Sequence, residues 1–575
     1  MRKYWNILKK YKVSLLISPI FVLISVIAET TQPLLMADIV DNGVMTRDLS
    51  VVSRVGLYMI LVSIVGLIAS MANVYVSSRT SIGFGTDLRT DLFKKIQELS
   101  FSDIDRFNSA SLITRLTNDI SRIQQIVLMS LRMFLRSPLM LVMALFYVLR
   151  INAELAWVLI VAIPILSVSV FFILRKGFPF FIKVQQKIDN LNAVVRENLI
   201  NLRVVKSFVR EDFEAEKFSE KNIDLRDMVI RASNIVVSIF PLMQLIMNVS
   251  VIAILWFGGQ KVISGNMKVG ELISFVNYLT QILMSLMILS MIMMAFARAA
   301  ASSERILEVL DTEPSLTETS EGLTDTYKIE KGEVIFEDVY FRHYKGENNV
   351  LRNINFHIRQ GETIAIVGAT GSAKSSMVQL IPRLYDVTGG KVLIDGIDVR
   401  DYKLAELHDK VGMVLQKNEL FTGSIIDNLR WGKPDATLEE VEIAAKAAQA
   451  HDFIMSFSDG YDTQLGRGGV NLSGGQKQRI CIARALLRKP KILILDDSTS
   501  AVDSNTEQKI RRNLSELLKD TTVLIITQRL NTMQSADRVI VLEDGEIDAM
   551  GRPSELLEKS KVYQEIYYSQ QIAFD

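Results

Sequence analysis

Cysteine is almost absent from this 575-residue chain, which contains only Cys481. A single thiol excludes an intramolecular disulfide framework and a cysteine-rich metal site, so we expect Cys481 to be a small buried residue of a helix. Excess charge of either sign is also absent, because the formal net charge is only +1. Without a long-range positive field, we expect no nucleic-acid partner.

Apolar residues, in contrast, make up 49% of the sequence, and the mean hydropathy of +0.24 is too high for a wholly water-soluble protein. The long apolar runs lie in the first 300 residues, and the remainder has the composition of a water-soluble domain. We predict a transmembrane domain at 1–310, a polar linker at 311–330 and a water-soluble α/β domain at 331–575.

The apolar runs are long enough to cross a hydrocarbon core of about 30 Å. The first follows a basic N-terminus, but it is too long for a signal peptide and contains Pro19 and Glu29. We predict six transmembrane helices, near Val13–Met36, Val55–Ser78, Leu128–Leu149, Leu155–Leu174, Ile235–Phe257 and Leu272–Phe296.

Two of the links between these helices, Arg79–Val127 and Arg175–Ser233, are long and rich in Lys and Arg. The positive-inside rule places them in the cytoplasm, so we expect a multi-pass protein of the cell membrane with both termini cytoplasmic. Each link contains an irregular piece, near Ser102–Ser109 and near Arg203–Glu211. Such a piece is either the turn of a solvated helical hairpin or a lever that contacts a cytoplasmic motor, and the residues alone leave both open.

Several unusual side chains lie in the apolar segments. Glu29, Arg132 and Arg136 either face a cavity or lie at helix ends in water. The last segment is rich in methionine, which either packs against neighbouring helices or forms an adaptable surface for apolar ligands. These methionines are Met284, Met287, Met291, Met293 and Met294.

A phosphate-binding loop is predicted directly after the strand Thr363–Val367. The order strand, glycine-containing loop and helix lets backbone N–H groups and a helix N-terminus hold phosphates, while Lys374 adds a charge and Ser375 can ligate Mg²⁺. Ala373 occupies a position where this pattern has glycine, and a positive φ there would make its Cβ unfavourable. The candidate residues are Gly368, Thr370, Gly371, Ser372, Ala373, Lys374, Ser375 and Ser376.

The run Ile492–Leu495 predicts a buried parallel strand that ends in two carboxylates, Asp496 and Asp497. Ligands bind at this end of the strands in open α/β sheets. Adjacent carboxylates repel one another unless a cation is present. We therefore predict a Mg²⁺–nucleotide site here.

Shortly before this strand stands Leu472-Ser473-Gly474-Gly475-Gln476. With the phosphate loop and the aspartate strand in this order, the whole chain resembles an ATP-binding cassette (ABC) exporter half-transporter. The resemblance implies an all-α six-helix transmembrane domain with long cytoplasmic helical extensions, followed by an α/β P-loop ABC nucleotide-binding domain. It also implies that Gln416 senses Mg²⁺, which Ser375 and Asp496 would ligate, and that Ser500–Asp503 is the D-loop. The two irregular cytoplasmic pieces would be coupling helices, which favours the lever.

Family members act as dimers, in which the signature Ser473, Gly474, Gly475 and Gln476 would complete the partner's ATP site in trans. The chain departs from the family pattern on the cis side alone. Asp497 replaces the catalytic glutamate, Gln528 the switch histidine, Ala373 a glycine and His343 the adenine-stacking aromatic residue, although Tyr344 is adjacent. The pattern resembles the degenerate subunit of heterodimeric bacterial multidrug exporters.

We therefore expect ATP-driven export of small, amphipathic or hydrophobic compounds by a heterodimer with a different half-transporter. A lipid or peptide exporter is an alternative, as is an ATP-gated channel or regulatory subunit on the same scaffold. The sequence has nothing that resembles the cysteine peptidase domain of bacteriocin exporters, which makes a peptide cargo less favoured.

Overall fold

The computed structural model describes residues 2–316, 327–343, 346 and 348–572. Its chain forms two compact units, one comprising residues up to Lys95 and Leu112–Asp311, the other Ile96–Ser111 and Thr312–Asp575. Residues 96–111 therefore group with the C-terminal half of the chain, although they come from the first long cytoplasmic link.

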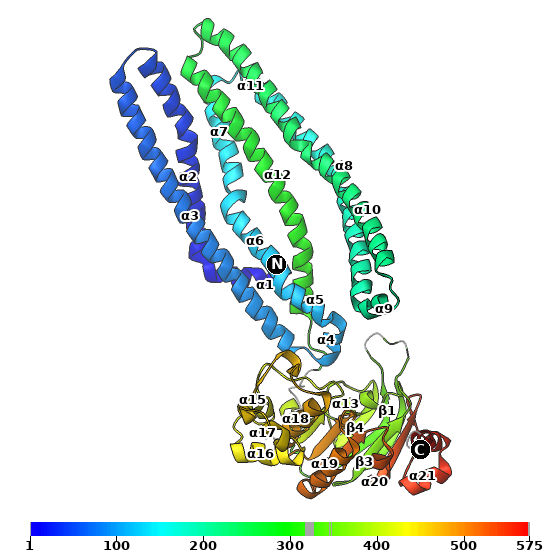
Figure 1. Cartoon of the computed structure of the whole chain (residues 1–575). Coiled ribbons are helices and arrows are strands. Elements are labelled where there is room, and N and C mark those ends of the chain that lie inside the picture. Colours follow the sequence, from blue (N-terminus) through cyan, green and yellow to red (C-terminus); the bar gives the residue numbers. More distant parts are fainter. Residues whose placement is uncertain (1, 317–326, 344–345, 347, 573–575) are drawn as a thin grey trace. The chain divides into compact units, whose positions relative to one another are not determined.

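The first unit is entirely helical (Figure 1). Six of its helical stretches are long and apolar enough to cross a membrane, which confirms the predicted number. Its α-helices are α1 (Arg2–Leu8), α2 (Lys12–Asp38), α3 (Leu49–Glu98, of which the part to Lys95 lies in this unit), α5 (Ser109–Thr114), α6 (Ile120–Met129), α7 (Arg136–Asn152), α8 (Trp157–Ile200), α9 (Leu202–Ser207), α10 (Glu211–Val237), α11 (Ile239–Ile263) and α12 (Val269–Asp311). The short turns η1 (Lys9–Tyr11), η2 (Ile39–Val44), η3 (Arg115–Asp119) and η4 (Ser130–Phe134) connect or interrupt them.

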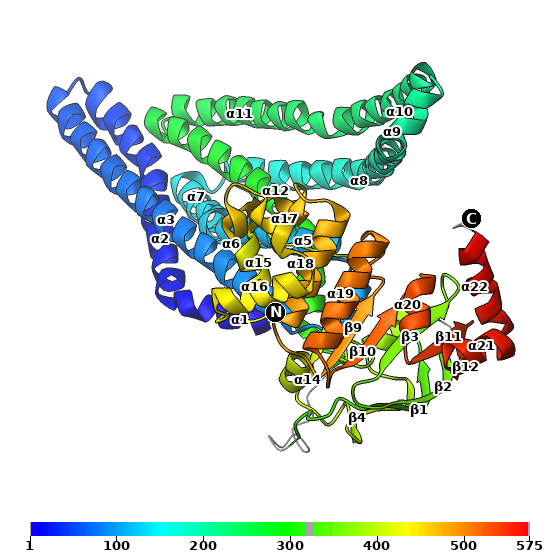
Figure 2. The same cartoon turned by 60° about the horizontal axis from the view of Figure 1, so that its bottom comes forward.

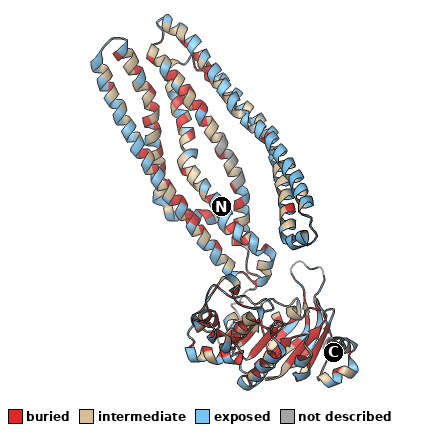
Figure 3. Ribbon diagram, viewed as in Figure 1, coloured by how far each residue is buried: buried red, intermediate tan, exposed pale blue. Residues whose placement is uncertain are grey.

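Many residues of these helices are exposed, as the pale blue ribbon in Figure 3 shows, and large apolar residues are among them. Leu57, Ile60 and Leu67 on α3 are examples. In water such an apolar surface would be unfavourable, but in a bilayer it faces lipid. The backbone N–H and C=O groups hydrogen-bond to one another within each helix, so none is left unpaired in the hydrocarbon. The helices also extend beyond the predicted spans, because the long links that follow the second and fourth spans continue as helix in α3 and α8.

The ionisable groups in the apolar segments have partners. Arg136 on α7 forms an ion pair with Glu29 on α2, whereas Arg132 donates to Ser77 Oγ at 2.9 Å and to the Val74 carbonyl at 3.0 Å. Of the methionines singled out above, Met284 is exposed, and the side chains of Met291, Met293 and Met294 lie outside the described residues.

The second unit is built on β-sheets (Figure 2). A six-stranded sheet has the order β12-β11-β3-β10-β9-β6, with parallel pairing except at the β11–β12 hairpin, and a four-stranded antiparallel sheet has the order β2-β1-β4-β5. The strands are β1 (Val334–Phe341), β2 (Leu351–Ile358), β3 (Thr363–Gly368), β4 (Gly389–Ile394), β5 (Ile397–Asp398), β6 (Val411–Val414), β7 (Gly423–Ser424), β8 (Gln464–Leu465), β9 (Ile492–Asp496), β10 (Thr522–Ile526), β11 (Arg538–Glu543) and β12 (Glu546–Gly551).

Strand β9 is the predicted buried strand. All five of its residues are buried, and it pairs in parallel with β10 on one side and β6 on the other. An unbroken apolar run is stable here because helices cover both faces of a parallel sheet. The helices of this unit are α4 (Phe101–Phe107), α13 (Lys374–Gln379), α14 (Leu404–Lys410), α15 (Ile425–Arg430), α16 (Leu438–Ala447), α17 (His451–Met455), α18 (Gly474–Leu486), α19 (Ser504–Leu517), α20 (Leu530–Ser535), α21 (Pro553–Lys559) and α22 (Lys561–Ile572).

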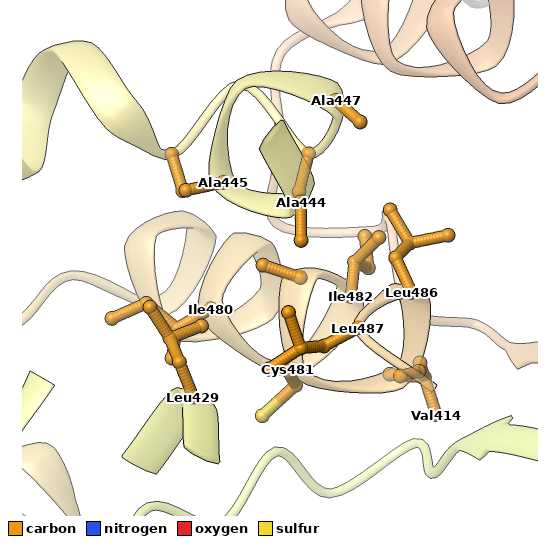
Figure 4. Close-up of a cluster of buried hydrophobic side chains, with 14 of the residues drawn as sticks. Val414, Leu429, Ala444, Ala445, Ala447, Ile480, Cys481, Ile482, Leu486 and Leu487 are labelled. Atoms are coloured by element: carbon orange, nitrogen blue, oxygen red, sulfur yellow. The ribbon is translucent and has the colours of Figure 1, made fainter. Parts of the chain in front are cut away.

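Cys481 lies on α18 within a large apolar cluster, as predicted (Figure 4). Its neighbours include Ile480, Ile482 and Leu486, and burial raises the pKa of its thiol. A buried thiol that stays protonated is a poor nucleophile, so Cys481 is a packing residue.

The first irregular cytoplasmic piece forms α4, which begins with a capping box between Ser100 and Asp103. Within the second unit, the Tyr385 hydroxyl donates a hydrogen bond of 2.8 Å to Asp105 Oδ2 and so connects α4 to the rest of that unit. The Ser315 N–H also donates to Asp103 Oδ2 at 3.0 Å. The second irregular piece forms α9, and Phe208 and Val209 directly after it are strongly exposed.

Candidate functional site

The phosphate loop connects β3 to α13, as the sequence predicts. Gly368 and Gly371 have φ angles of +154° and +90°, in the region that favours glycine. Inside the loop, the Lys374 ammonium donates to the carbonyls of Gly368 at 2.9 Å and Ala369 at 2.7 Å, and to Ser372 Oγ at 3.2 Å. Burial lowers the pKa of Lys374, whereas the nearby Asp496 and Asp497 raise it.

Ala373 immediately precedes α13 and has φ +68° and ψ +21°. This is the left-handed conformation, which costs an L-residue with a Cβ about 1 kcal/mol relative to glycine. A positive φ at this position was the condition under which the Cβ of Ala373 would be unfavourable, and the structure meets that condition. Ala373 is therefore strained directly before the start of α13.

Asp496 ends β9 and is 2% exposed. Its Oδ1 accepts a hydrogen bond of 2.9 Å from Ser375 Oγ, which joins the aspartate strand to the phosphate loop. Burial raises the pKa of Asp496, the Ser375 hydrogen bond opposes the shift, and the charge of Asp497 adds to it. A cation at this point would relieve the cost of the buried carboxylate.

Asp497 also has a left-handed backbone, with φ +47°. Burial raises the pKa of its carboxyl, and hydrogen bonds from Ser500 and Gln416 together with the charge of Arg529 oppose that rise. The exposed Gln528 follows β10, the neighbouring strand.

These residues meet around one cavity of about 380 Å³. Its lining includes most of the predicted cis residues, namely Thr370, Gly371, Ala373, Lys374, Ser375, Ser376, Gln416, Asp496, Asp497 and Gln528. Gly368 and Ser372 do not line it, but both accept from Lys374, which does.

His343 lies beside this cavity instead of lining it. Its Nε2 is 3.2 Å from Ser376 Oγ, so it contacts the start of α13. Phe341 and Tyr385 pack edge-on against its ring, with centroids 4.8 and 5.5 Å away. Tyr344, the alternative adenine-stacking residue, lies outside the described residues.

The signature residues Ser473, Gly474, Gly475 and Gln476 do not line the cavity. Ser473 caps α18, with its Oγ accepting from the Gln476 N–H at 3.3 Å and its own N–H donating to Gln476 Oε1 at 2.9 Å. A Cβ on Gly475 would lie 2.7 Å from the Ala501 carbonyl, so this glycine lets the D-loop pack against the helix start. A helix N-terminus of this kind suits an anion.

The sequence interpretation missed two residues near this site. Arg529 pairs with the buried Glu507 and donates to the Ser500 carbonyl at 2.9 Å, and its position next to Gln528 could have suggested a role. Tyr385 connects His343 to Asp105. No local pattern marks this link, because Tyr385 and Asp105 are 280 residues apart.

The residues present fit Mg²⁺. Ser375 Oγ, Asp496 Oδ1 and Gln416 are oxygen donors of the kind that this ion prefers. The described residues contain no group of three or more His, Cys, Asp or Glu that could hold a metal by themselves. That agrees with an ion bound by one carboxylate and the oxygens of a nucleotide.

Comparisons with known proteins agree with this architecture. Residues 15–286 match the family described as ABC transporter transmembrane region, and residues 351–500 match the family described as ABC transporter. The chain is 42% identical to the uncharacterized ABC transporter ATP-binding protein YfiB of Bacillus subtilis, over 99% of this chain and 98% of that protein.

Two further relatives carry functional names. The chain is 32% identical to the "Putative multidrug export ATP-binding/permease protein YgaD" of Bacillus subtilis, over 100% of this chain and 99% of that protein. It is 33% identical to the ATP-dependent lipid A-core flippase of Syntrophus aciditrophicus, over 84% of this chain and 80% of that one. A solved bacterial Atm1-family ABC exporter with ATP bound shares the fold, with a TM-score of 0.81, 24% identity and 98% coverage of both chains.

Proposed function

The chain belongs to the ABC transporter family as an exporter half-transporter, and on this premise we propose that it exports small amphipathic or hydrophobic compounds as one half of a heterodimer. The proposal adds three points to the family assignment. Its own ATP site hydrolyses slowly, its signature completes a competent site on a different partner chain, and its cargo is of the multidrug type.

One observation carries the heterodimer proposal. Every departure from the family pattern lies at or beside the cis cavity, at Ala373, Asp497, Gln528 and His343. The signature, in contrast, forms a complete helix cap at Ser473. A homodimer would have two weak sites, whereas a heterodimer uses the intact signature where catalysis occurs.

In the cis site, Lys374 and the loop N–H groups hold the phosphates of ATP. Ser375 and Asp496 would hold Mg²⁺, which would neutralise negative charge on the phosphates. The Asp497 carboxylate is too short to orient the attacking water well. Gln528 donates a hydrogen bond to the γ-phosphate but carries no positive charge. ATP therefore remains bound here for longer than at the partner's site.

In the trans site, Ser473 and the start of α18 face the γ-phosphate of ATP on the partner's phosphate loop. Closing both sites brings the two nucleotide-binding domains together. Helices α4 and α9 pass this movement to the transmembrane helices, which alternate between inward and outward access. Hydrolysis at the partner's site resets the cycle.

The membrane topology is part of the proposal. Both termini lie in the cytoplasm, as the basic links and N-terminus favour. We propose the domain limits 1–310, 311–330 and 331–575, with the α4 segment grouping with the third domain in space.

The names of two relatives bear on the cargo. YgaD is described as a multidrug exporter and the Syntrophus protein as a lipid A-core flippase. Both cargo classes are amphipathic, so a lipid is the second candidate. Uphill transport of a fluorescent drug in proteoliposomes, compared with lipid scrambling, separates them. An ATP-gated channel would give only downhill flux.

The heterodimer is tested by purifying the tagged chain from its own membranes with the half-transporter that accompanies it. In that pair Asp497→Asn should leave most ATP hydrolysis intact, whereas Ser473→Ala should reduce it at least tenfold. Thr437→Ala is a matched control, because it removes the same kind of capping box from α16 at a comparable cost of about 1 kcal/mol. The reverse ranking of Asp497→Asn and Ser473→Ala, or self-association alone, contradicts the proposal.

A further inference from the structure

An open groove of about 790 Å³ runs along one side of α3. All of its lining residues lie between Ser70 and Gly83, and its apolar part consists of Met71, Val74 and Ile82, which are all exposed. Tyr75, Ser78 and Arg79 supply its polar part. The groove thus combines apolar side chains with the cationic side chain of Arg79.

Two arginines contact the residues that line this groove. Arg79 donates to the Tyr75 hydroxyl at 3.2 Å. Arg132, which the π-helical turn η4 carries, reaches α3 and donates to Ser78 Oγ at 2.5 Å and to the Val74 carbonyl. Both Val74 and Ser78 line the groove.

Neither arginine is neutralised by an acidic residue. Among the described residues, Arg79 and Arg132 form no ion pair, whereas Arg136 one turn further along is paired with Glu29. Arg132 is also held in place by Ser77 on α3. A guanidinium that is ordered by neutral partners and lacks a counter-charge suits an anionic ligand.

The N-terminal segment extends the positive charge. Gly83 at the end of the groove packs directly on Tyr11, since a Cβ there would lie 2.5 Å from the tyrosine hydroxyl oxygen. Lys9 and Lys12 flank this tyrosine and are exposed. Lys10 differs, because it pairs with Asp87 at 3.1 Å.

All of these cations fall at one level of the membrane. Lys12 directly precedes the first predicted span, Arg79 directly follows the second, and Arg132 is near the start of the third. In the topology proposed above, that level is the boundary between the bilayer and the cytoplasm. The cytoplasmic leaflet contains anionic lipids, and basic pockets between transmembrane helices at this depth recognise their headgroups.

We propose that this groove binds an anionic phospholipid of the cytoplasmic leaflet. The lipid phosphate accepts hydrogen bonds from Arg79 and Arg132, and an acyl chain lies along Met71, Val74 and Ile82. Free phosphate would leave these apolar side chains uncovered, whereas a lipid covers them. The groove shares no lining residue with the cavity at the phosphate loop, and only its assignment to the cytoplasmic leaflet rests on the topology in the proposed function.

The test is native mass spectrometry of the delipidated full-length protein, in the oligomeric state in which it is purified and without nucleotide. Dioleoyl phosphatidylglycerol should bind at least fivefold more tightly than dioleoyl phosphatidylcholine. Arg79→Gln should bring this ratio close to one. Arg54→Gln is the matched control, because it removes an exposed arginine from the opposite end of α3.

Arg132→Gln should lower the ratio as well, but it removes contacts that hold η4 against α3, so the exposed Arg79 is the decisive position. Three results overturn the proposal: no preference for phosphatidylglycerol, an equal loss in Arg54→Gln, or displacement of the lipid by millimolar glycerol 3-phosphate, which would indicate a site for a free phosphate. The measurement needs no ATP hydrolysis, so failure of the proposed export function would not alter it. If the topology were inverted, the preference would persist while a labelled lipid would be accessible from the other leaflet.

Discussion

Lengthening the carboxylate at position 497 should restore hydrolysis at the cis site. Asp497→Glu moves the carboxyl group outward by about one C–C bond, or roughly 1.5 Å. A misplacement near 1 Å costs about a hundredfold in rate, which corresponds to about 2.7 kcal/mol in the activation barrier. Glutamate tolerates the φ of +47° less well than aspartate does, at about 1 kcal/mol in folding stability. That cost affects the amount of folded protein and leaves the chemical step unchanged.

We therefore expect a 10- to 100-fold increase in ATP turnover for Asp497→Glu combined with Gln528→His. The two gains should not add fully, because both side chains act on the same γ-phosphate. The assay is phosphate release by the purified heterodimer, in which the partner's own site is silenced by replacing its phosphate-loop lysine, with Lys374→Ala as the background. Asp497→Asn, the matched control, should give no gain. An increase below threefold with ATP binding unchanged would refute the assignment of Asp497 as the reason for slow hydrolysis.

The other predictions concern strain, charge and the α4 contact. Ala373→Gly removes about 1 kcal/mol of left-handed strain and should raise the free energy of unfolding of the nucleotide-free protein by about that amount in a denaturant titration; a lower value would contradict it. Since burial raises the pKa of Asp496, the folded state holds this proton more firmly than the unfolded state, and nucleotide-free stability should fall as pH rises above about 4. Asp496→Asn should melt higher at pH 7 and show a flatter melting profile between pH 4 and 7, and an unchanged profile would contradict this. Tyr385→Phe loses the 2.8 Å hydrogen bond to Asp105, worth about 1 kcal/mol, and should reduce cargo-stimulated but not basal ATPase activity; equal loss of both would contradict it.

The local features of the ATP site could be predicted because each depends on a short stretch of chain. The apolar run before Asp496 forms the buried parallel strand β9. Ser473 caps α18, the helix that begins at Gly474. The left-handed φ at Ala373 follows from the same reasoning, since glycine would normally occupy that position. Hydropathy likewise predicts the six membrane-crossing helices, because a bilayer imposes a minimum apolar length.

Features that depend on long-range packing could not be predicted. The contact between Tyr385 and Asp105 joins residues that no periodicity relates. The turn η4, which directs Arg132 toward α3, has no glycine or proline to mark it. His343 was expected at the adenine, but whether it lies in the cavity or beside it depends on Phe341 and Tyr385, whose ring packing the sequence does not encode locally.

The attachment of α4 to the second unit matters for anyone who isolates the nucleotide-binding domain as a soluble fragment. A fragment that begins at Thr312 would lack α4 and would expose the Tyr385 ring, which packs against Phe101 of that helix. Burial and the Asp105 carboxylate both raise the pKa of Tyr385 and keep its phenol a hydrogen-bond donor, so the fragment would present an apolar ring and an unused donor to solvent. ATP affinities measured on such a fragment would describe a domain in which Tyr385, the residue that packs on His343, has lost its contacts with α4. Adding the α4 peptide back would measure how much those contacts contribute to the affinity.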